Sequence, residues 1–223
     1  MRTELTDERP FDVFGRRTAD MSDSNPSDGT MDGLRVTACE RCPELCASRR
    51  RIVNGVGDQD AAILFVGEAP GEQEDQTGEP FVGRSGEVLT AALRDRGLAR
   101  TDVRITNAVR CRPPNNRDPH VEERESCRSY LDQEIERVDP ELIVTLGKVP
   151  GEHLLGRSLA VTNEAGTVHD ARIGGRSRRV LISIHPATTL YDPSQNDTFG
   201  AALDEAIGLA GLDETSADTE GQS

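Results

Sequence analysis

The chain of 223 residues is poor in several residue types, and each shortage excludes something. It has a single lysine (Lys148), no tryptophan, and only 3% aromatic residues. No apolar run approaches the roughly 18 residues that a membrane-spanning helix requires. The N-terminus also lacks the apolar core of a secretory signal. We therefore expect a cytoplasmic protein with no membrane partner.

Positive charge is scarce as well. The 40 acidic and 26 basic residues give a net charge of −14, which argues against a generic nucleic-acid binder with a broad basic patch. The basic residues are nearly all arginine, which can still bind phosphates bidentately against an acidic background. An acid excess with so little lysine favours adaptation to high internal salt, where charges are largely screened. Drift of a GC-rich genome toward Arg and Asp is the alternative.

The two ends of the chain carry much of the acid excess. Residues 1–34 hold eight acids and four bases, and residues 213–223 hold four acids and no base. Neither segment shows a sustained hydrophobic period, so we predict two disordered acidic tails. Residues 35–212 are long enough for one α/β domain.

Between these tails, short apolar runs alternate with amphipathic segments. Continuous apolar runs, typical of buried parallel strands, cover 61–67, 103–109, 141–147 and 179–186. Helical patterns cover 85–97, 119–138, a short segment ending near Gly156, and 198–210, and residues 161–175 suggest a hairpin. The alternation predicts a three-layer α/β/α sandwich with a central, mostly parallel four-stranded sheet.

Three polar features follow predicted strands. The loop GEAPG starts at Gly67, and Asn107 and His185 each stand at the end of a later strand. Ligands of such sheets bind beyond the carboxyl ends of the strands. The whole loop, residues 67–86, resembles a phosphate-binding turn in its glycines, but its five carboxylates would repel a bare phosphate. We therefore expect a different ligand.

The chain has five cysteines, of which Cys39 and Cys42 form a C-x2-C pair. Together with Cys111 and Cys127 they could hold either a tetrahedral zinc ion or a four-iron cluster. The second C-x2-C pair of a compact zinc ribbon is missing, Cys46 could compete as a ligand, and unrelated buried thiols are a further alternative.

The segment RCRPPNNR suggests an exposed turn around Cys111. Its arginines Arg110, Arg112 and Arg117 would suit a loop that touches a nucleic-acid backbone.

Taken together, CERC, GEAPGEQEDQTGEPFVGRSG, TNAVRCRPPNNR, the later Cys127 and HPATTL resemble the family 4, iron–sulfur uracil-DNA glycosylases over residues 39 to about 210. The resemblance implies a monofunctional hydrolase that flips uracil out of single- or double-stranded DNA and starts base-excision repair of deaminated cytosine. We expect a monomer. The resemblance also implies a [4Fe–4S] cluster on Cys39, Cys42, Cys111 and Cys127, which leaves Cys46 as a spare thiol.

The same resemblance assigns the catalytic roles to Glu68 and His185. Breaking the N-glycosidic bond develops positive charge on the sugar, which the Glu68 carboxylate would stabilise while it helps to orient the attacking water. His185 would polarise uracil O2 as the base leaves.

Four further residues are implied in substrate binding. The small Ala69 lets the backbone approach the flipped nucleotide, and Phe81 stacks on uracil. Glu74 crowds the C5 edge and excludes the thymine methyl. The Asn107 amide donates to O4 and accepts from N3–H, a pattern that cytosine does not match.

The stretch HPATTLYDPSQ departs from the family pattern. Thr188 and Thr189 replace bulkier residues, and Tyr191 stands where an arginine is expected, although Leu190 could still wedge a duplex. The departure predicts weaker opening of a DNA duplex and favours single-stranded DNA as the substrate. Two other classes stay open: a cluster-bearing DNA binder without cleavage, and an iron–sulfur redox protein.

Overall fold

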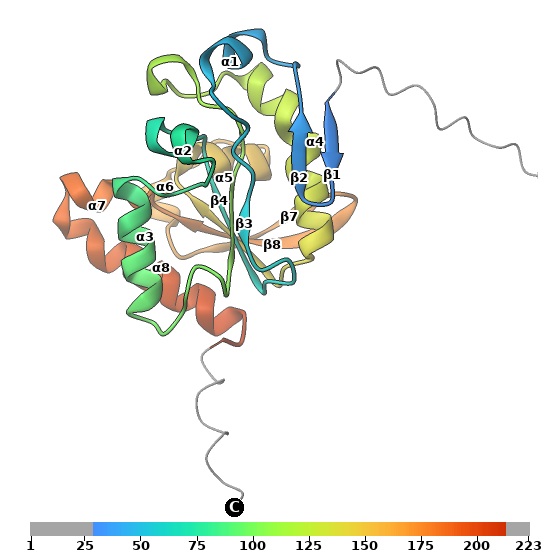
Figure 1. Cartoon of the computed structure of the whole chain (residues 1–223). Helices are drawn as coiled ribbons and strands as arrows, with labels where there is room; N and C mark the ends of the chain where they lie inside the picture. Colours follow the sequence, from blue (N-terminus) through green and yellow to red (C-terminus); the bar gives the residue numbers. More distant parts are fainter. Residues whose placement is uncertain (1–28, 213–223) are drawn as a thin grey trace, which may run out of the picture.

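The computed structural model describes residues 29–212. They form three layers, with a six-stranded sheet between two layers of helices (Figure 1). The strand order is β3-β5-β4-β6-β8-β7. The inner four strands are parallel, and β3 and β7 pair antiparallel at the edges. The strands are β3 (Val56–Gly57), β4 (Ile63–Gly67), β5 (Arg104–Asn107), β6 (Leu142–Leu146), β7 (Val168–Ile173) and β8 (Arg176–Ser183).

The predicted three-layer, mostly parallel fold is confirmed, and its four predicted strands are β4, β5, β6 and β8. The strand count of four was too low, because the two antiparallel edge strands carry weak sequence signals: β3 has two residues, and β7 is largely exposed. The hairpin predicted over 161–175 starts with a short helix, α6 (Val161–Glu164). Within the predicted segment, only β7 belongs to a hairpin, and its partner strand is β8, which follows the segment.

Each face of the sheet is covered by helices, as the alternation of side chains along β4 requires. Ile63 and Phe65 pack on one face with α3 and α8, whereas Leu64 and Val66 pack on the other with α4 and α5. The helices are α1 (Pro43–Ser48), α2 (Glu72–Thr77), α3 (Arg84–Arg94), η2 (Pro114–Asn116), α4 (Val121–Val138), α5 (Lys148–Leu155), α7 (Thr188–Tyr191), η3 (Pro193–Gln195) and α8 (Asn196–Leu209).

A separate antiparallel pair, β1 (Thr30–Asp32) and β2 (Arg35–Ala38), packs beside α4 (Figure 1). β1 lies inside residues 1–34, which we predicted as a tail, so that boundary was placed too late. Residues 1–28 and the second predicted tail, 213–223, lie outside the described residues. Among the described helices, none combines the length and apolar character that crossing a bilayer demands.

The sheet register gathers the predicted site at one edge. Gly67 at the end of β4 pairs with Asn107 at the end of β5. Leu146 and Ser183 pair at the ends of β6 and β8, and His185 follows two residues after β8. Residues far apart in sequence therefore meet because the parallel strands end together.

Candidate active site

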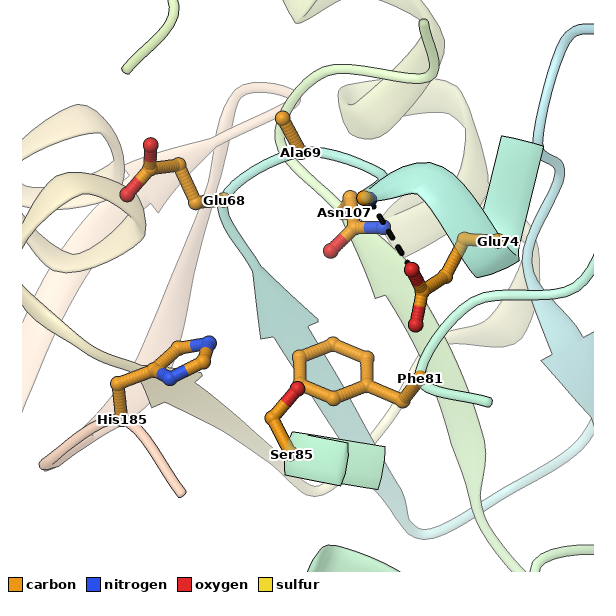
Figure 2. Close-up of a pocket in the computed structure, with 8 residues that line it drawn as sticks. Glu68, Ala69, Glu74, Phe81, Ser85, Asn107 and His185 are labelled. Carbon is orange, nitrogen blue, oxygen red and sulfur yellow. Dashed lines mark hydrogen bonds between the residues drawn. The ribbon is translucent and has the colours of Figure 1, made fainter. Parts of the chain in front are cut away.

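A cavity of about 200 Å³ opens at this edge of the sheet (Figure 2). All six predicted pocket residues line it, together with Gly71 of the GEAPG loop and Ser85, which we did not predict; the full lining is Glu68, Ala69, Gly71, Glu74, Phe81, Ser85, Asn107 and His185. The volume lies below the range of roughly 300–1,000 Å³ that is usual for drug-sized ligands. The cavity therefore suits one small ring.

The floor of the cavity depends on Gly67. A methyl group at this position would overlap both Asn107 Oδ1 and the Phe81 ring. Asn107 is 3% exposed, and the Phe81 ring is similarly buried. The missing side chain of Gly67 thus leaves room for the amide and the aromatic ring to lie side by side.

His185 stands opposite Phe81, with the two ring centroids 6.0 Å apart (Figure 2). Its Nδ1 accepts the backbone N–H of Ala187 at 3.1 Å. Burial lowers the pKa of His185, against a weaker opposing effect of the Glu74 charge, so the ring is neutral at pH 7. Because Nδ1 acts as the acceptor, the neutral ring carries its proton on Nε2 and can donate from there.

Glu68 follows β4 directly, and its environment alters its acidity. Burial raises the pKa of Glu68 to about 7; the neighbouring Asp118 carboxylate acts in the same direction, and Arg124 opposes it. Neither neighbour could be inferred from the sequence, because both lie about 50 residues downstream and reach Glu68 only through the fold. Glu68 therefore titrates near neutrality rather than in the usual acidic range of a carboxyl group.

Glu74 is buried beside the cavity and accepts three backbone hydrogen bonds. Its Oε2 accepts from Gly71 N–H at 3.1 Å (Figure 2). Its Oε1 accepts from Val82 N–H at 3.1 Å and from Gly83 N–H at 2.9 Å. The side chain thus ties the start of α2 to the segment that carries Phe81, a role that the sequence did not reveal.

The four predicted ligand cysteines gather beside α4. Cys39 follows β2, Cys42 precedes α1, Cys111 follows β5, and Cys127 lies in α4. All four belong to one cluster of packed side chains. We predicted Cys111 in an exposed turn, but it is 7% exposed, because Leu45, Val109 and Tyr130 pack around it.

The spacing of the four sulfurs bears on the two metal centres that the sequence allowed. Around a zinc ion with bonds of about 2.3 Å, the sulfurs would be about 4 Å apart. Within residues 29–212, the potential ligand atoms of Glu44, His120 and Glu123 lie within 4.8 Å of one another. No three cysteines of this range form such a group. The described thiols therefore do not have the close spacing of a formed zinc site.

The surroundings of the thiols also suit an anionic cluster. Arg49 donates from Nη1 to Cys111 Sγ at 2.9 Å and from Nη2 to the Cys39 carbonyl at 2.6 Å. Burial raises the pKa of Cys42 to about 11 and of Cys111 to about 12, so both are neutral thiols until a metal displaces their protons. Cys46 is not part of this packed cluster, and its thiol contacts the Cys39 carbonyl at 3.5 Å.

The arginines around Cys111 divide between the interior and the surface. The prediction for Arg110 was wrong: it is 1% exposed and donates to Glu134 at 2.6 Å, so it cannot touch a phosphate backbone. Glu134 also accepts from Arg104 at 2.8 Å, so Arg104, Arg110 and Glu134 form a buried charged triad between β5 and α4. Arg112 stays partly exposed and donates to Asn116 Oδ1 at 2.7 Å.

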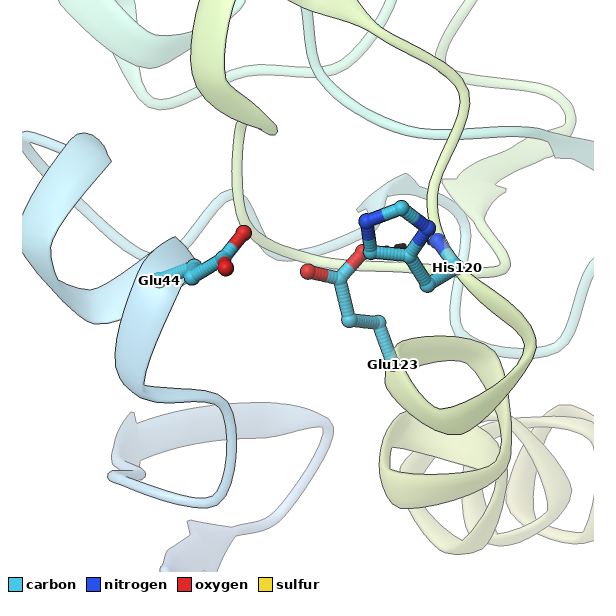
Figure 3. A group of neighbouring side chains, drawn as sticks. All are labelled: Glu44, His120 and Glu123. Atoms are coloured by element: carbon cyan, nitrogen blue, oxygen red, sulfur yellow. Dashed lines mark hydrogen bonds between the residues drawn. The ribbon is translucent and has the colours of Figure 1, made fainter.

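Glu44, His120 and Glu123 lie close together (Figure 3), and Arg117 bridges the two carboxylates. Its guanidinium contacts Glu44 at 3.0 Å and Glu123 at 2.7 Å, and the His120 N–H also donates to Glu123. Hydrogen bonding to Arg117 lowers the pKa of Glu123. The carboxylates are thus satisfied by an arginine rather than arranged for a metal ion.

The segment after His185 forms α7, which presents two apolar side chains outward. Leu190 is 36% exposed and Tyr191 is 81% exposed. The predicted wedge and the residue that departs from the family pattern therefore both face solvent.

These features define an α/β protein with a small polar pocket at its strand ends and a four-cysteine cluster beside it. Residues 54–207 match the model of the uracil DNA glycosylase superfamily. A type-4 uracil-DNA glycosylase of Archaeoglobus fulgidus is 40% identical over 168 residues, covering 74% of this chain and 84% of the relative. One from Thermotoga maritima is 44% identical over 161 residues, covering 72% and 82%.

A type-5 uracil-DNA glycosylase of Pyrobaculum aerophilum is more distant, at 32% identity over 183 residues, covering 69% of this chain and 80% of the relative. The chain belongs to the uracil-DNA glycosylase superfamily, and within it to the type-4 branch. The family resemblance inferred from the motifs is confirmed.

Proposed function

We propose that the protein is a monofunctional uracil-DNA glycosylase that flips uracil out of DNA, hydrolyses its N-glycosidic bond and so starts repair of deaminated cytosine. The observation that carries the proposal is the pocket itself: Glu68, Phe81, Asn107 and His185 converge on a cavity the size of one small ring. The relatives named as type-4 uracil-DNA glycosylases support the same activity.

The pocket binds the flipped base on one face and one edge. Phe81 offers the face on which uracil stacks, and Asn107 pairs with O4 and N3–H. Because Asn107 is buried at a strand end, its amide is held in place and rejects the reversed pattern of cytosine. Ala69 leaves space for the sugar.

The reaction needs charge stabilisation at two places. The ionised Glu68 faces the sugar, stabilises its developing positive charge and orients the attacking water. The neutral His185 donates from Nε2 to uracil O2 and so stabilises the leaving base as an anion. Its tautomer is prepared by the Ala187 N–H before substrate arrives.

The experiment that tests the activity uses the purified full chain and an oligonucleotide with a single uracil. Alkaline cleavage after incubation reveals abasic sites, and a matched oligonucleotide with cytosine serves as the control. Cleavage at uracil alone supports the proposal. Binding without cleavage would instead indicate a DNA-binding module, and electron transfer without either would indicate a redox protein.

The selectivity of the pocket gives one prediction. We expect Asn107→Asp to lower the rate of uracil excision and to admit cytosine, because a protonated carboxyl can rearrange its donor and acceptor. Thymine in a G·T mismatch stays excluded while Glu74 is present. The measurement is single-turnover excision from three oligonucleotides that differ in one base. Release of thymine by the wild type at a rate similar to that of uracil would show that Glu74 does not exclude it.

The acidity of Glu68 gives a second prediction. Because the carboxylate is the active form and the pKa of Glu68 is about 7, the rate rises with pH through neutrality and falls about tenfold per pH unit below it. Burial lowers the pKa of His185, which places its protonation at lower pH than that of Glu68. Asp118→Asn moves the midpoint to lower pH by removing a neighbouring negative charge, and Glu68→Gln abolishes the dependence. A midpoint unchanged in Asp118→Asn would refute the coupling.

Salt tolerance gives a third prediction. If the net charge of −14 reflects a saline cytoplasm, excision persists at about 1 M KCl, where ordinary DNA binders have lost most phosphate affinity. Stacking on Phe81 and the Asn107 amide pair are screened little. The test is a KCl series with the wild type and Arg112→Ala, which weakens binding and flattens its salt dependence. Activity that peaks at low salt and vanishes near 1 M contradicts this adaptation.

We also propose that Cys39, Cys42, Cys111 and Cys127 hold a [4Fe–4S] cluster. Its role is structural: when bound, it joins β2, α1, the segment after β5 and α4, which surround the pocket side of the sheet. The free thiols, their common packing beside α4 and the Arg49 bond to Cys111 support the assignment. The protein acts as a monomer on single- or double-stranded DNA, and the presence of Thr188 and Thr189 in α7, in place of bulkier residues, favours single strands.

A further inference from the structure

Arg100 lies outside the cavity, on the loop between α3 and β5, yet it contacts the segment that carries Phe81. Its guanidinium donates from Nη2 to the Pro80 carbonyl at 2.8 Å and from Nη1 to the Phe81 carbonyl at 2.9 Å. Nη1 also contacts Thr90 Oγ1 of α3 at 3.2 Å. One planar, half-buried cation therefore binds two successive carbonyls and anchors them to a helix.

The segment needs an anchor because the Phe81 backbone has a φ of +54°. A bulky residue seldom adopts this left-handed conformation, which persists only where the surroundings enforce it. Gly86 leaves room for the Phe81 carbonyl, which a side chain at that position would overlap. Glu74 binds the N–H groups of Val82 and Gly83, so Arg100 completes the set from the carbonyl side.

We infer that Arg100 is a positioning residue for Phe81, which fixes the aromatic ring as a wall of the base pocket and thereby sets how tightly uracil stacks. The inference rests on the proposed function. Arg100 does not touch the base; it acts on the stacking ring through the backbone.

A double-mutant cycle between Arg100 and Phe81 tests the inference. The readout is inhibition of excision by free uracil, since uracil binding depends on stacking and not on DNA opening. We expect Arg100→Ala to raise the uracil inhibition constant about fivefold to thirtyfold, within the range that loss of base stacking produces. In a Phe81→Ala background the same change adds less than about twofold, because the ring it positions is gone.

Arg96 offers a matched control on the same loop. It also donates to two backbone carbonyls, those of Ala92 and Gly200, each at 3.0 Å, but it joins α3 to α8 away from the cavity. Arg96→Ala lowers the melting temperature as Arg100→Ala does, yet it leaves the uracil inhibition constant within about twofold in both backgrounds. This control separates a loss of stability from a loss of positioning.

Arg100→Lys keeps the inference testable if Arg100→Ala does not fold. Lysine retains the charge and the apolar stem but cannot reach both carbonyls with a planar fork. It raises the inhibition constant in the same direction by a smaller factor. Fold-changes of Arg100 and Phe81 variants that multiply, or an Arg100 variant with an unchanged inhibition constant, overturn the inference. Absence of uracil excision by the wild type in the same assay refutes the proposed function instead.

Discussion

We expect His185→Ala to lower the single-turnover rate constant for uracil excision by about a hundredfold to a thousandfold. This is the usual loss when a preorganised donor to a developing anion is removed. The donor is Nε2–H, which the Ala187 N–H secures by hydrogen bonding to Nδ1. The loss is the same at low and at high KCl, because His185 acts on bond breaking and not on encounter with DNA.

The measurement is single-turnover excision across a KCl series, with the affinity for the oligonucleotide determined in parallel. His169→Ala is the control: His169 lies in β7, outside the cavity lining, so its loss leaves the rate near that of the wild type. A rate for His185→Ala within about threefold of the wild type would remove His185 from the mechanism.

We expect Cys111→Ala, in protein prepared without oxygen, to lower the iron content from about four per chain to less than about one. The wild type should be brown, and the variant should be colourless and unfold at lower temperature. The reason is geometric: Cys111 is one of four convergent thiols, and it joins the segment after β5 to the rest of the cluster. Its loss leaves three sulfurs around a centre that needs four ligands.

Cys46→Ala provides the matched control for the iron measurement. The Cys46 thiol contacts the Cys39 carbonyl but does not belong to the packed cluster that contains the other four cysteines. Its removal therefore leaves iron content and colour unchanged. A colourless wild type with one zinc per chain and normal excision would refute the iron–sulfur assignment, and iron loss in Cys46→Ala would change the ligand set.

Much of the fold could be predicted from the sequence because buried parallel strands have distinct patterns. The continuous apolar run at Ile63–Gly67 can only be satisfied by a strand covered on both faces. The stripe of α4, including Leu131 and Ile135, likewise predicted its packing on the sheet. The edge strands escaped prediction since β3 is too short to show a period and β7 buries little.

The GEAPG loop, Asn107 and His185 could be predicted as a site because they follow strands that end together, whereas Glu74 and Phe81 were implied only by the family resemblance. The buried charges could not be predicted. Arg110 has the composition of a surface residue, and only the fold places Glu134 and Arg104 around it. In the same way, no local pattern connects Arg100 with Phe81, 19 residues earlier.

The sequence by itself therefore determined the layers of the fold, the family and the chemical groups available for reaction, since these follow from residue type and order along the chain. The tertiary structure decided the state of those groups. It raised the pKa of Glu68 through burial and the neighbouring Asp118. It also fixed the His185 proton on Nε2 through the Ala187 N–H, and it placed Phe81 in a left-handed conformation between Glu74 and Arg100. Acidity, tautomer and backbone strain depend on neighbours in space, which folding brings together from distant parts of the chain.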